Sequence, residues 1–407
     1  MTNENALKSS YDRTVKETNL LTAVDDINVI DQLSRIIGNG YFQKKTDFKK
    51  DILITVPAKN EEATIVRTLQ SLKKQFYLSG ACFDYDLFEV LVLCNNCTDD
   101  TLRKCNDFKH KNPDFPLHVL VSNSKIISNV GVARRILMNI ACSRVSKDGF
   151  IVTTDADTVA DKFFLSGIYQ YLDADYGLIC GRILVDDAHL DTKAKKYLHA
   201  SRHYLDLMCK LESTLYPDFS DPWPKHAHNS GPNLSIRKYA YQKIGGIPPL
   251  GFLEDIALYE LVLSHGFKVK HCMQTVVTTS TRTTPRVPGG FGNQLREWAE
   301  FDERRDSYNV ESFEKLFQKF SAYELIKQLY LTGNLNLVKE ICDKLKMPHD
   351  QLKELYKTHD RYQSLVRFLE SALPNSSKWN VTYPDIDIFM AIAQLETYFI
   401  TVEHEKV

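Results

Sequence analysis

Two carboxylates one residue apart, Asp155 and Asp157, directly follow the β-branched segment Ile151-Val152-Thr153-Thr154. β-Branched residues favour an extended backbone, on which side chains two residues apart point to the same side. Two anions this close repel each other unless a cation lies between them. Hard oxygen ligands suit Mg²⁺ or Mn²⁺, which commonly join a protein carboxylate to a substrate phosphate, so the pair predicts a divalent-metal site. The alternative is an acidic turn after an ordinary strand.

Two further groups of side chains could do chemistry. Glu254 and Asp255 precede an apolar helix expected over 256–263, where the helix dipole stabilises a carboxylate. Alternatively, a carboxylate there takes a proton from a hydroxyl. His226 and His228 could contact substrate hydroxyls. Two such histidines also suit a metal on a strand, but no cysteine or third histidine is near in sequence.

Cys94 and Cys97 form a Cys-x-x-Cys pair between a predicted strand and a predicted helix, which imitates a thioredoxin-type redox site. The chain has nine cysteines, and most lie within apolar strand or helix patterns. An odd number of such cysteines favours reduced, buried thiols over a disulfide framework.

The elements that must position these groups follow an α/β pattern. Short apolar strands are predicted at 53–56, 90–93, 117–121 and 150–153, with helices at 61–75, 99–109 and 129–145 between them. Alternating strands and helices predict a mostly parallel sheet with helices on both faces. Ligands bind such sheets at the carboxyl ends of the strands, which is where Asp155 and Asp157 fall.

Helical patterns flank this region on both sides. Residues 12–37 predict an amphipathic helix that Gly38 and Gly40 end, and from about residue 310 helices separated by Pro374 and Pro384 replace the strand signals. We therefore expect an N-terminal helical extension over 1–50, an α/β domain over 51–305 and a C-terminal helical region over 306–407.

The composition is that of a globular protein of 407 residues, with 43% hydrophobic and 25% charged residues. Its 51 basic and 52 acidic residues nearly balance, which argues against a nucleic-acid partner. No apolar run is long enough for a transmembrane segment, and the polar start is no signal peptide. These features predict a soluble, cytoplasmic protein.

Six segments, in this order, resemble a GT-A fold (Rossmann-like) glycosyltransferase of family 2, over about 51–300. They are Val56–Glu62, Cys94–Thr101, Gly131–Arg135, Asp155–Asp157, Asn229–Arg237 with Gly245-Gly246, and Gly251–Asp255. The resemblance implies transfer of a sugar from a nucleotide diphosphate sugar to an acceptor hydroxyl. It also implies Mn²⁺ or Mg²⁺ as cofactor.

The resemblance assigns the donor side first. Pro57, Lys59 and Glu61 would line a slot for the base, together with Asn95. The family often has Asp where Asn95 stands, and Asn can donate as well as accept, so the donor is open between a UDP- and a GDP-sugar. A turn between strand and helix is the alternative for Pro57.

For the diphosphate, the resemblance points to Arg134 or Arg135. Side chains at neighbouring helical positions point apart, so only one of the two would bind the diphosphate, and Arg134 matches the family better. The alternative is that Arg134 is an ordinary surface arginine. Asp157 would bind the metal, with Asp155 on the ribose or on the metal through water.

Further contacts to the metal and to the leaving group are less defined. Some relatives carry a polar ligand where this chain has Val159, which leaves His271 or water as a further metal ligand; packing at a strand edge is the alternative for His271. Arg282 and Arg286 lie on a loop rich in glycine and proline, which either orders over the donor phosphate or is a linker.

On the acceptor side, the resemblance implies contacts from His228, Ser230, Gly231 and Asn233, with Asp255 as the base of an inverting transfer and Glu254 beside it. The acceptor itself is unknown. The C-terminal helices would either cover the acceptor site or form a homodimer.

Three rival functions remain. Asp155-x-Asp157 after a strand also fits a haloacid dehalogenase-type phosphatase, but three strands precede it here and the downstream Gly-Asp-x-x-x-Asp is missing. Gln294–Trp298 resembles a processive-synthase motif at the wrong spacing, so we reject that function. A redox role of Cys94 and Cys97, and a non-catalytic nucleotide-sugar-binding protein, stay open.

Overall fold

The computed structural model of the chain describes residues 20–42, 49–281, 291–301 and 307–404, with the backbone alone for 20–26 and Phe291. It divides into two compact units. The first, here called the sheet unit, is built from the described residues of Thr18–Leu190 and His228–Gln294. The second, the helical unit, comes from those of Asp191–Ala227 and Leu295–Val407.

The sheet unit contains an eight-stranded sheet in the order β3-β2-β1-β4-β7-β6-β8-β5. Its strands are β1 (Lys50–Ala58), β2 (Phe88–Asn95), β3 (Leu117–Ser122), β4 (Val145–Thr153), β5 (Val159–Ala160), β6 (Leu178–Val185), β7 (Leu234–Arg237) and β8 (Val269–Thr279). The run from β3 to β4 is parallel, and β6 pairs parallel with β8. The pairings of β7 with β4 and β6, and of β5 with β8, are antiparallel. The prediction of a mostly parallel sheet is confirmed.

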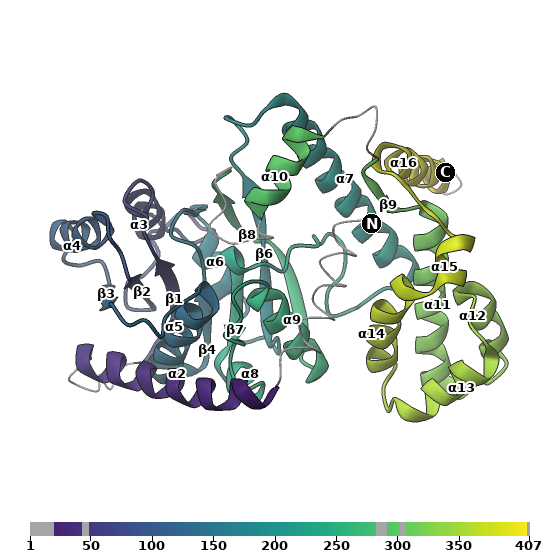
Figure 1. Ribbon diagram of the computed structural model, residues 1–407, viewed down its shortest axis with the longest axis horizontal. Coiled ribbons are helices and arrows are strands. Elements are labelled where there is room, and N and C mark those ends of the chain that lie inside the picture. Colours follow the sequence, from purple (N-terminus) through teal and green to yellow (C-terminus); the bar gives the residue numbers. More distant parts are fainter. Residues whose placement is uncertain (1–19, 43–48, 282–290, 302–306, 405–407) are drawn as a thin grey trace. The chain divides into compact units, whose positions relative to one another are not determined.

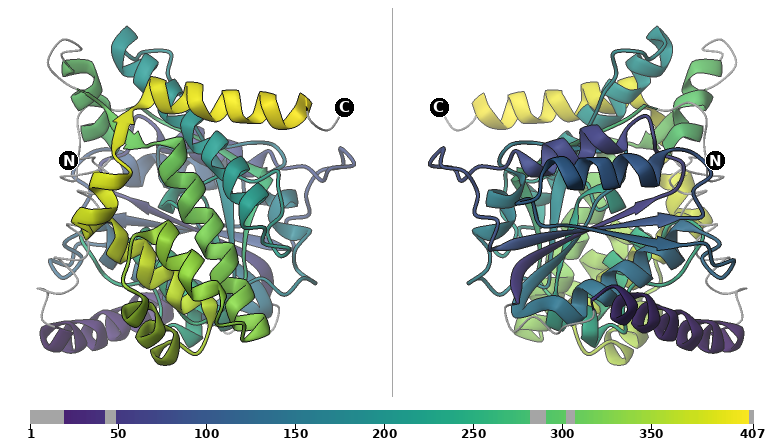
Figure 2. Two further views of the ribbon diagram at one scale, coloured as in Figure 1. Left: turned by 90° about the vertical axis from the view of Figure 1, so that its right-hand side faces the viewer. Right: turned by 90° about the vertical axis from the view of Figure 1, so that its left-hand side faces the viewer.

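Helices cover both faces of this sheet, as the right-hand view of Figure 2 shows, with α3 and α4 above the strands and α2 below. They are α2 (Leu20–Tyr41), α3 (Ile65–Lys73), α4 (Thr101–Lys111), α5 (Val130–Arg144), α6 (Phe164–Tyr169), α8 (Lys238–Lys243) and α9 (Glu254–Ser264), with the 3₁₀ turn η1 (Gly231–Asn233). Strand side chains alternate between the two faces: Ile52 and Ile54 pack toward α3 and α6, whereas Leu53 packs toward α5.

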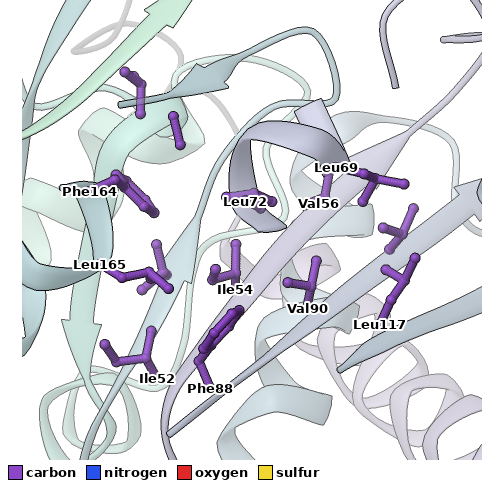
Figure 3. Close-up of a cluster of buried hydrophobic side chains, with 14 of the residues drawn as sticks. Ile52, Ile54, Val56, Leu69, Leu72, Phe88, Val90, Leu117, Phe164 and Leu165 are labelled. Carbon is purple, nitrogen blue, oxygen red and sulfur yellow. The ribbon is translucent and has the colours of Figure 1, made fainter. Parts of the chain in front are cut away.

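The core on the α3 side is drawn in Figure 3, where Phe88 and Ile54 lie between Leu72, Leu165 and Val90. These side chains are fully buried. Burying one such side chain contributes roughly 1.5–3 kcal/mol to folding. The core therefore fixes the strands and, with them, the loops that leave their carboxyl ends.

The N-terminal helix α2 runs on past the point where we predicted its end. Gly38 and Gly40 lie inside it, although each costs about 1 kcal/mol relative to alanine in a helix. Tertiary contacts offset that cost: Tyr41 accepts a hydrogen bond from Lys109 and packs edge-on against His118, and Phe42 stacks on Arg144. Figure 1 shows α2 lying along α5.

The helical unit consists mainly of helices packed on one another. It contains α7 (Thr192–Leu215), α11 (Phe313–Thr332), α12 (Leu337–Leu345), α13 (His349–Thr358), α14 (Tyr362–Ala372), η2 (Leu373–Asn375), α15 (Ser377–Thr382) and α16 (Ile388–His404). A two-stranded antiparallel sheet joins β9 (Asn309–Glu311) to β10 (Asp385–Asp387). These strands, of three residues each, are too short to give an apolar pattern in the sequence.

The predicted domain limits differ from these two units. The helix α2 packs on α5 within the sheet unit, and α7 packs on α11 and α16 although these helices lie far apart in the chain. The helix α10 (Phe291–Glu300) runs across the boundary between the two residue ranges. None of the described helices is long and apolar enough to span a membrane.

Candidate functional site

The carboxyl edge of the sheet gathers most of the predicted site residues. Thr153 ends β4 and is paired with Thr55 of β1 and with Leu234 of β7. Because β1 is parallel to β4 and β7 is antiparallel, the residues after β1 and those before β7 emerge at the same edge as Asp155. Pro57, Asn95 and Gly231 therefore come to this edge together with the two aspartates.

Arg134 lies at the centre of this edge. Its side chain is only 4% exposed, and it extends from the second turn of α5. The guanidinium donates Nη1 to Thr153 Oγ1 and, at 3.0 Å, to the carbonyl of Gly231, and it donates Nη2 to Asp155 Oδ1. Nε lies 2.9 Å from Glu254 Oε1, without the alignment of a hydrogen bond. The arginine thus joins three elements: the end of β4, η1 and the start of α9.

Asp255 connects the start of α9 to η1 from the other side. Its Oδ2 accepts the backbone N–H of Gly231 at 2.6 Å, and its Oδ1 accepts that of Ile256 at 2.8 Å. A carboxylate has about four lone-pair sites, so each oxygen retains capacity for one further proton donor. The side chain is partly exposed, and it is held in a defined orientation that an acceptor hydroxyl could meet.

Gly231 is the residue that permits this close packing. A Cβ atom added there would lie 2.7 Å from Nη2 of Arg134, closer than real Cβ contacts. The backbone of Gly231 donates to Asp255 and accepts from both Arg134 and Thr153. A larger residue at this position would displace Arg134 from the carbonyl of Gly231 and from the carboxylate of Asp155.

The electrostatics of the cluster are dominated by acids. Glu254 is 4% exposed, and burial raises its pKa to about 7 although Arg134 opposes the shift. Asp155 keeps 31% of its side-chain surface exposed, yet the protein packs closely enough around its carboxyl for burial to raise its pKa, and the neighbouring Asp157 adds to that rise. Burial alone would lower the pKa of Arg134, but Asp155, Glu254 and Asp255 outweigh it, so its pKa is raised.

Asp157 lies on the turn that joins β4 to β5. Its Oδ2 accepts a hydrogen bond from Ser280 Oγ at 2.7 Å, and Thr158 next to it bonds to Thr279. Ser280 therefore belongs to the site, although nothing in the sequence pattern pointed to it: it follows β8, and only the β5–β8 pairing brings it beside Asp157.

His271 does not reach the two aspartates. On β8, His271 is paired with Cys180 of β6, Cys180 with Leu234 of β7, and Leu234 with Thr153 of β4. His271 therefore lies three strands from β4, about 14 Å away at the usual strand spacing. Among the described residues, no three His, Cys, Asp or Glu side chains are grouped to hold a metal ion. The prediction of His271 as a further ligand is therefore wrong.

The predicted base slot lies at the ends of β1 and β2. Lys59 is exposed, Pro57 is half-buried, and Glu61 is buried with its carboxylate accepting from Thr64 Oγ1 at 2.8 Å. Asn60 adopts a positive φ of 55° and bonds to Thr98, which ties the two strand-end loops together. Asn95 is buried and donates to the carbonyl of Ile127.

The acceptor-side residues divide into two kinds. His228 accepts the backbone N–H of Ile183 on Nδ1 at 2.9 Å, and Ser230 is half-buried. Asn233 is 0% exposed and donates to the carbonyls of Arg182 and Thr275. It crosslinks β6 to β8 and offers no surface to an acceptor, so the prediction that it contacts one does not hold.

Arg282 and Arg286, which were predicted on the donor side, lie outside the described residues.

The cysteine pair does not have the electrostatics of a redox site. Cys94 and Cys97 are free thiols. A hydrogen bond with Cys105 raises the pKa of Cys94 to about 12, and a hydrogen bond with Cys94 raises the pKa of Cys97. Reactive cysteines have lowered pKa values, because the thiolate is the reacting form. These thiols are packing groups at the end of β2.

The segment that carries most of this edge matches a known protein family. Residues 53–245, which carry Arg134, both aspartates and Gly231, match the sequence model of the family described as "Glycosyl transferase family 2". This segment belongs to glycosyltransferase family 2. The match ends before Glu254 and Asp255, so those two acids enter the site through their contacts with Arg134 and Gly231.

Individual relatives are distant. The probable glycosyltransferase YdaM of Bacillus subtilis (strain 168) is 23% identical over 283 residues, which are 69% of this chain and 60% of that protein. The chain therefore spans less than two thirds of the length of this curated relative.

Solved structures also resemble the chain. The mannosyltransferase PcManGT from Pyrobaculum calidifontis in complex with GDP-Man and Mn²⁺ has 13% identity and a TM-score of 0.41, covering 95% of this chain and 98% of that one. S. aureus TarS 1-349 in complex with UDP has 13% identity and a TM-score of 0.42, covering 82% and 91%. These TM-scores are low, so the description of the fold is based on the strand order and register given above and not on these structures.

Proposed function

We propose that the protein is a glycosyltransferase that moves a sugar from a nucleoside diphosphate to an acceptor hydroxyl, with inversion at the anomeric carbon. The observation that supports this most is the cluster of Arg134, Asp155, Glu254 and Asp255 at the carboxyl edge of a family 2 segment. It combines a partly exposed acid for a metal or ribose, a fixed guanidinium and an oriented carboxylate within one edge of a sheet.

In the proposed reaction, Asp255 takes the proton of the acceptor hydroxyl as that oxygen bonds to the anomeric carbon. The bond from this carbon to the β-phosphate oxygen breaks, and the nucleoside diphosphate leaves with the electron pair. Asp255 suits this role because its two hydrogen bonds to backbone N–H groups fix the direction of its free lone pairs. The other side of the sugar ring must then face Asp155 and Asp157.

The chemistry of the two aspartates fits a divalent cation. Their carboxylates are hard oxygen donors two residues apart, and Mg²⁺ or Mn²⁺ commonly takes one or two protein carboxylates and completes its shell with substrate phosphates and water. Such an ion would neutralise charge on the departing diphosphate. Asp157 is the first candidate ligand, since Asp155 already shares Oδ1 with Arg134.

The rival functions gain no support at this site. A phosphatase of the haloacid dehalogenase type needs the first aspartate as a nucleophile, but here Oδ1 of Asp155 is held by a buried arginine. A redox role for Cys94 and Cys97 is opposed by their raised pKa values. The choice between a UDP- and a GDP-sugar, and the acceptor, stay predictions.

A thermal-shift screen tests the proposal. We expect UDP or GDP with MnCl₂ to raise the melting temperature, because a ligand that binds only the folded state stabilises it, by about 2.7 kcal/mol at a hundred times its dissociation constant. The matching nucleotide sugar should then be hydrolysed slowly, with release of the nucleoside diphosphate. If no nucleoside diphosphate binds with or without metal, the proposed function is wrong.

A further inference from the structure

Arg135, the neighbour of Arg134 on α5, makes a second and separate set of contacts. Its side chain is buried, and it donates Nε and Nη2 to the two carboxylate oxygens of Asp31 at 2.9 and 3.1 Å. Its remaining nitrogen, Nη1, donates to the carbonyl of Ile247 at 2.8 Å. One guanidinium therefore joins three elements: α2 through Asp31, α5 itself, and the segment between α8 and α9.

Other polar side chains reinforce the same junction. Asn139, one turn further along α5, donates to Asp31 at 2.7 Å and accepts from the hydroxyl of Tyr241 on α8 at 2.8 Å. Tyr241 is buried. The carboxylate of Asp31 thus accepts three hydrogen bonds from α5 and links α2 to the helix that carries Arg134.

The α8–α9 segment, Gly245–Leu253, leads directly into Glu254 and Asp255. Gly246 has a φ of 85°, and a Cβ atom there would lie 3.0 Å from Nη1 of Arg135, so the segment passes close over the guanidinium. Further on, the backbone of Leu250 lies against Gly131 of α5, where a Cβ atom would meet its carbonyl at 2.0 Å. Two points on α5 therefore fix the segment before it turns into α9.

We propose that Asp31 is a positioning residue for the candidate base Asp255, acting through Arg135 and the carbonyl of Ile247. The inference rests on the proposed function for its effect on catalysis, and on the hydrogen bonds above for its mechanism. Without the carboxylate, Arg135 loses the partner that fixes its plane. Its hydrogen bond to the carbonyl of Ile247, one of the two contacts that fix the α8–α9 segment, is then weakened. Asp255 would then occupy its position beside Gly231 for less of the time.

A matched ion pair in the same unit provides the control. Arg144 donates to both oxygens of Glu89 at 2.9 and 2.8 Å, and both side chains are largely buried. Glu89 lies near the start of β2, at the amino edge of the sheet, opposite the site. Glu89→Ala therefore also removes a carboxylate that takes two hydrogen bonds from an arginine of α5, without touching the α8–α9 segment.

Hydrogen–deuterium exchange of the full chain tests the positioning itself. The N–H groups of Gly231 and Ile256 are protected by the carboxylate of Asp255. In Asp31→Ala, we expect faster exchange in peptides that cover 246–257 and Gly231, with unchanged exchange in β3. In Glu89→Ala, the 246–257 peptides should exchange as in the wild type. Unchanged exchange of these peptides in Asp31→Ala would overturn the inference.

Turnover separates positioning from general stabilisation. With the nucleotide sugar that the wild type hydrolyses, Asp31→Ala should lower kcat about ten- to a hundredfold, since a displacement of about 1 Å costs that much. The affinity for UDP or GDP with MnCl₂ should stay unchanged, and Asp31→Asn, which keeps one acceptor oxygen, should recover part of the rate. Equal losses of kcat and nucleotide affinity, or the same losses in Glu89→Ala, would contradict the inference. If the wild type turns over no nucleotide sugar, the proposed function fails, while the exchange measurement still decides the positioning.

Discussion

At the scale of residues, the site is a concentration of negative charge around one buried guanidinium. Asp155, Glu254 and Asp255 all raise the pKa of Arg134, and burial raises the pKa of both Asp155 and Glu254. Charges with the same sign in so small a volume cost stability, and a cation that enters the site would relieve that cost. Perturbed pKa values grouped in this way are common at functional sites.

Glu254 gives this charge concentration a measurable pH dependence. Its folded-state pKa is about 7 against an ordinary value of 4.5, so between these values the folded protein holds a proton that the unfolded chain has lost. The stabilisation is full below pH 4.5 and is lost as the pH rises through 7. It is on the order of 3 kcal/mol, at about 1.4 kcal/mol per pKa unit.

The variant Glu254→Gln removes this titration. We expect the free energy of unfolding, measured in urea from pH 5 to pH 8, to fall less steeply for Glu254→Gln than for the wild type. The difference should accumulate between pH 5 and 7 and then level off. Parallel curves for the two proteins would show that Glu254 is ionised throughout this range.

At the scale of elements, η1 is the junction on which the cluster depends. The position of Gly231 between Arg134 and Asp255 leaves no room for a side chain. We predict that Gly231→Ala lowers stability by about 1–3 kcal/mol, the usual cost of overpacking, and lowers kcat more than tenfold by displacing Arg134. The measurement is a urea unfolding curve together with hydrolysis of the nucleotide sugar.

Gly251→Ala is the matched control for that experiment. Gly251 is exposed in the nearby α8–α9 segment, and the nearest atom to a Cβ there is 4.0 Å away, on Asn129. Its stability and kcat should stay close to the wild type. Equal effects of the two substitutions would mean that the tight packing at Gly231 has no special role.

The sequence predicts the positions of those residues at this edge that directly follow a predicted strand. Asp155 and Asp157 follow β4, and the short apolar runs of β1, β2 and β4, with helices between them, are enough to place the strand ends side by side. Pairings between distant segments are not visible in this way. Ser280 reaches Asp157 only because β8 pairs with β5, and His271 on the same strand ends up at a distance because β7 and β6 lie between β8 and β4.

Local propensity also misleads where tertiary contacts decide. Gly38 and Gly40 were expected to end α2, but Tyr41 and Phe42 pack against His118 and Arg144 and carry the helix onward. Asn233 was expected to contact the acceptor, because its motif resembles an acceptor-side segment. Its amide instead donates hydrogen bonds to the carbonyls of Arg182 and Thr275.

At the scale of the whole molecule, the helical unit is stabilised by its own buried polar network. Lys315 on α11 is 2% exposed, and its ammonium donates to Asn380 of α15 at 2.9 Å and to Asp385 of β10 at 2.8 Å. A buried charge is tolerated only when it is paired in this way. The unit therefore has a defined internal structure, and α7 is part of it although the chain returns to the sheet unit after α7. Continuous domain ranges could not have predicted that arrangement.

In the proposed function, Asp157 acts on the side of the metal and the diphosphate, and Asp255 acts on the side of the acceptor proton. The most direct measurement compares UDP or GDP binding in MnCl₂ and turnover of the matching nucleotide sugar for Asp157→Ala and Asp255→Asn. We predict that Asp157→Ala loses metal-dependent nucleotide binding. Asp255→Asn should bind as the wild type does and lose about 10²- to 10⁴-fold in kcat, the usual contribution of a general base. Wild-type turnover by Asp255→Asn, or unchanged binding by Asp157→Ala, would show that these residues do not have the proposed roles.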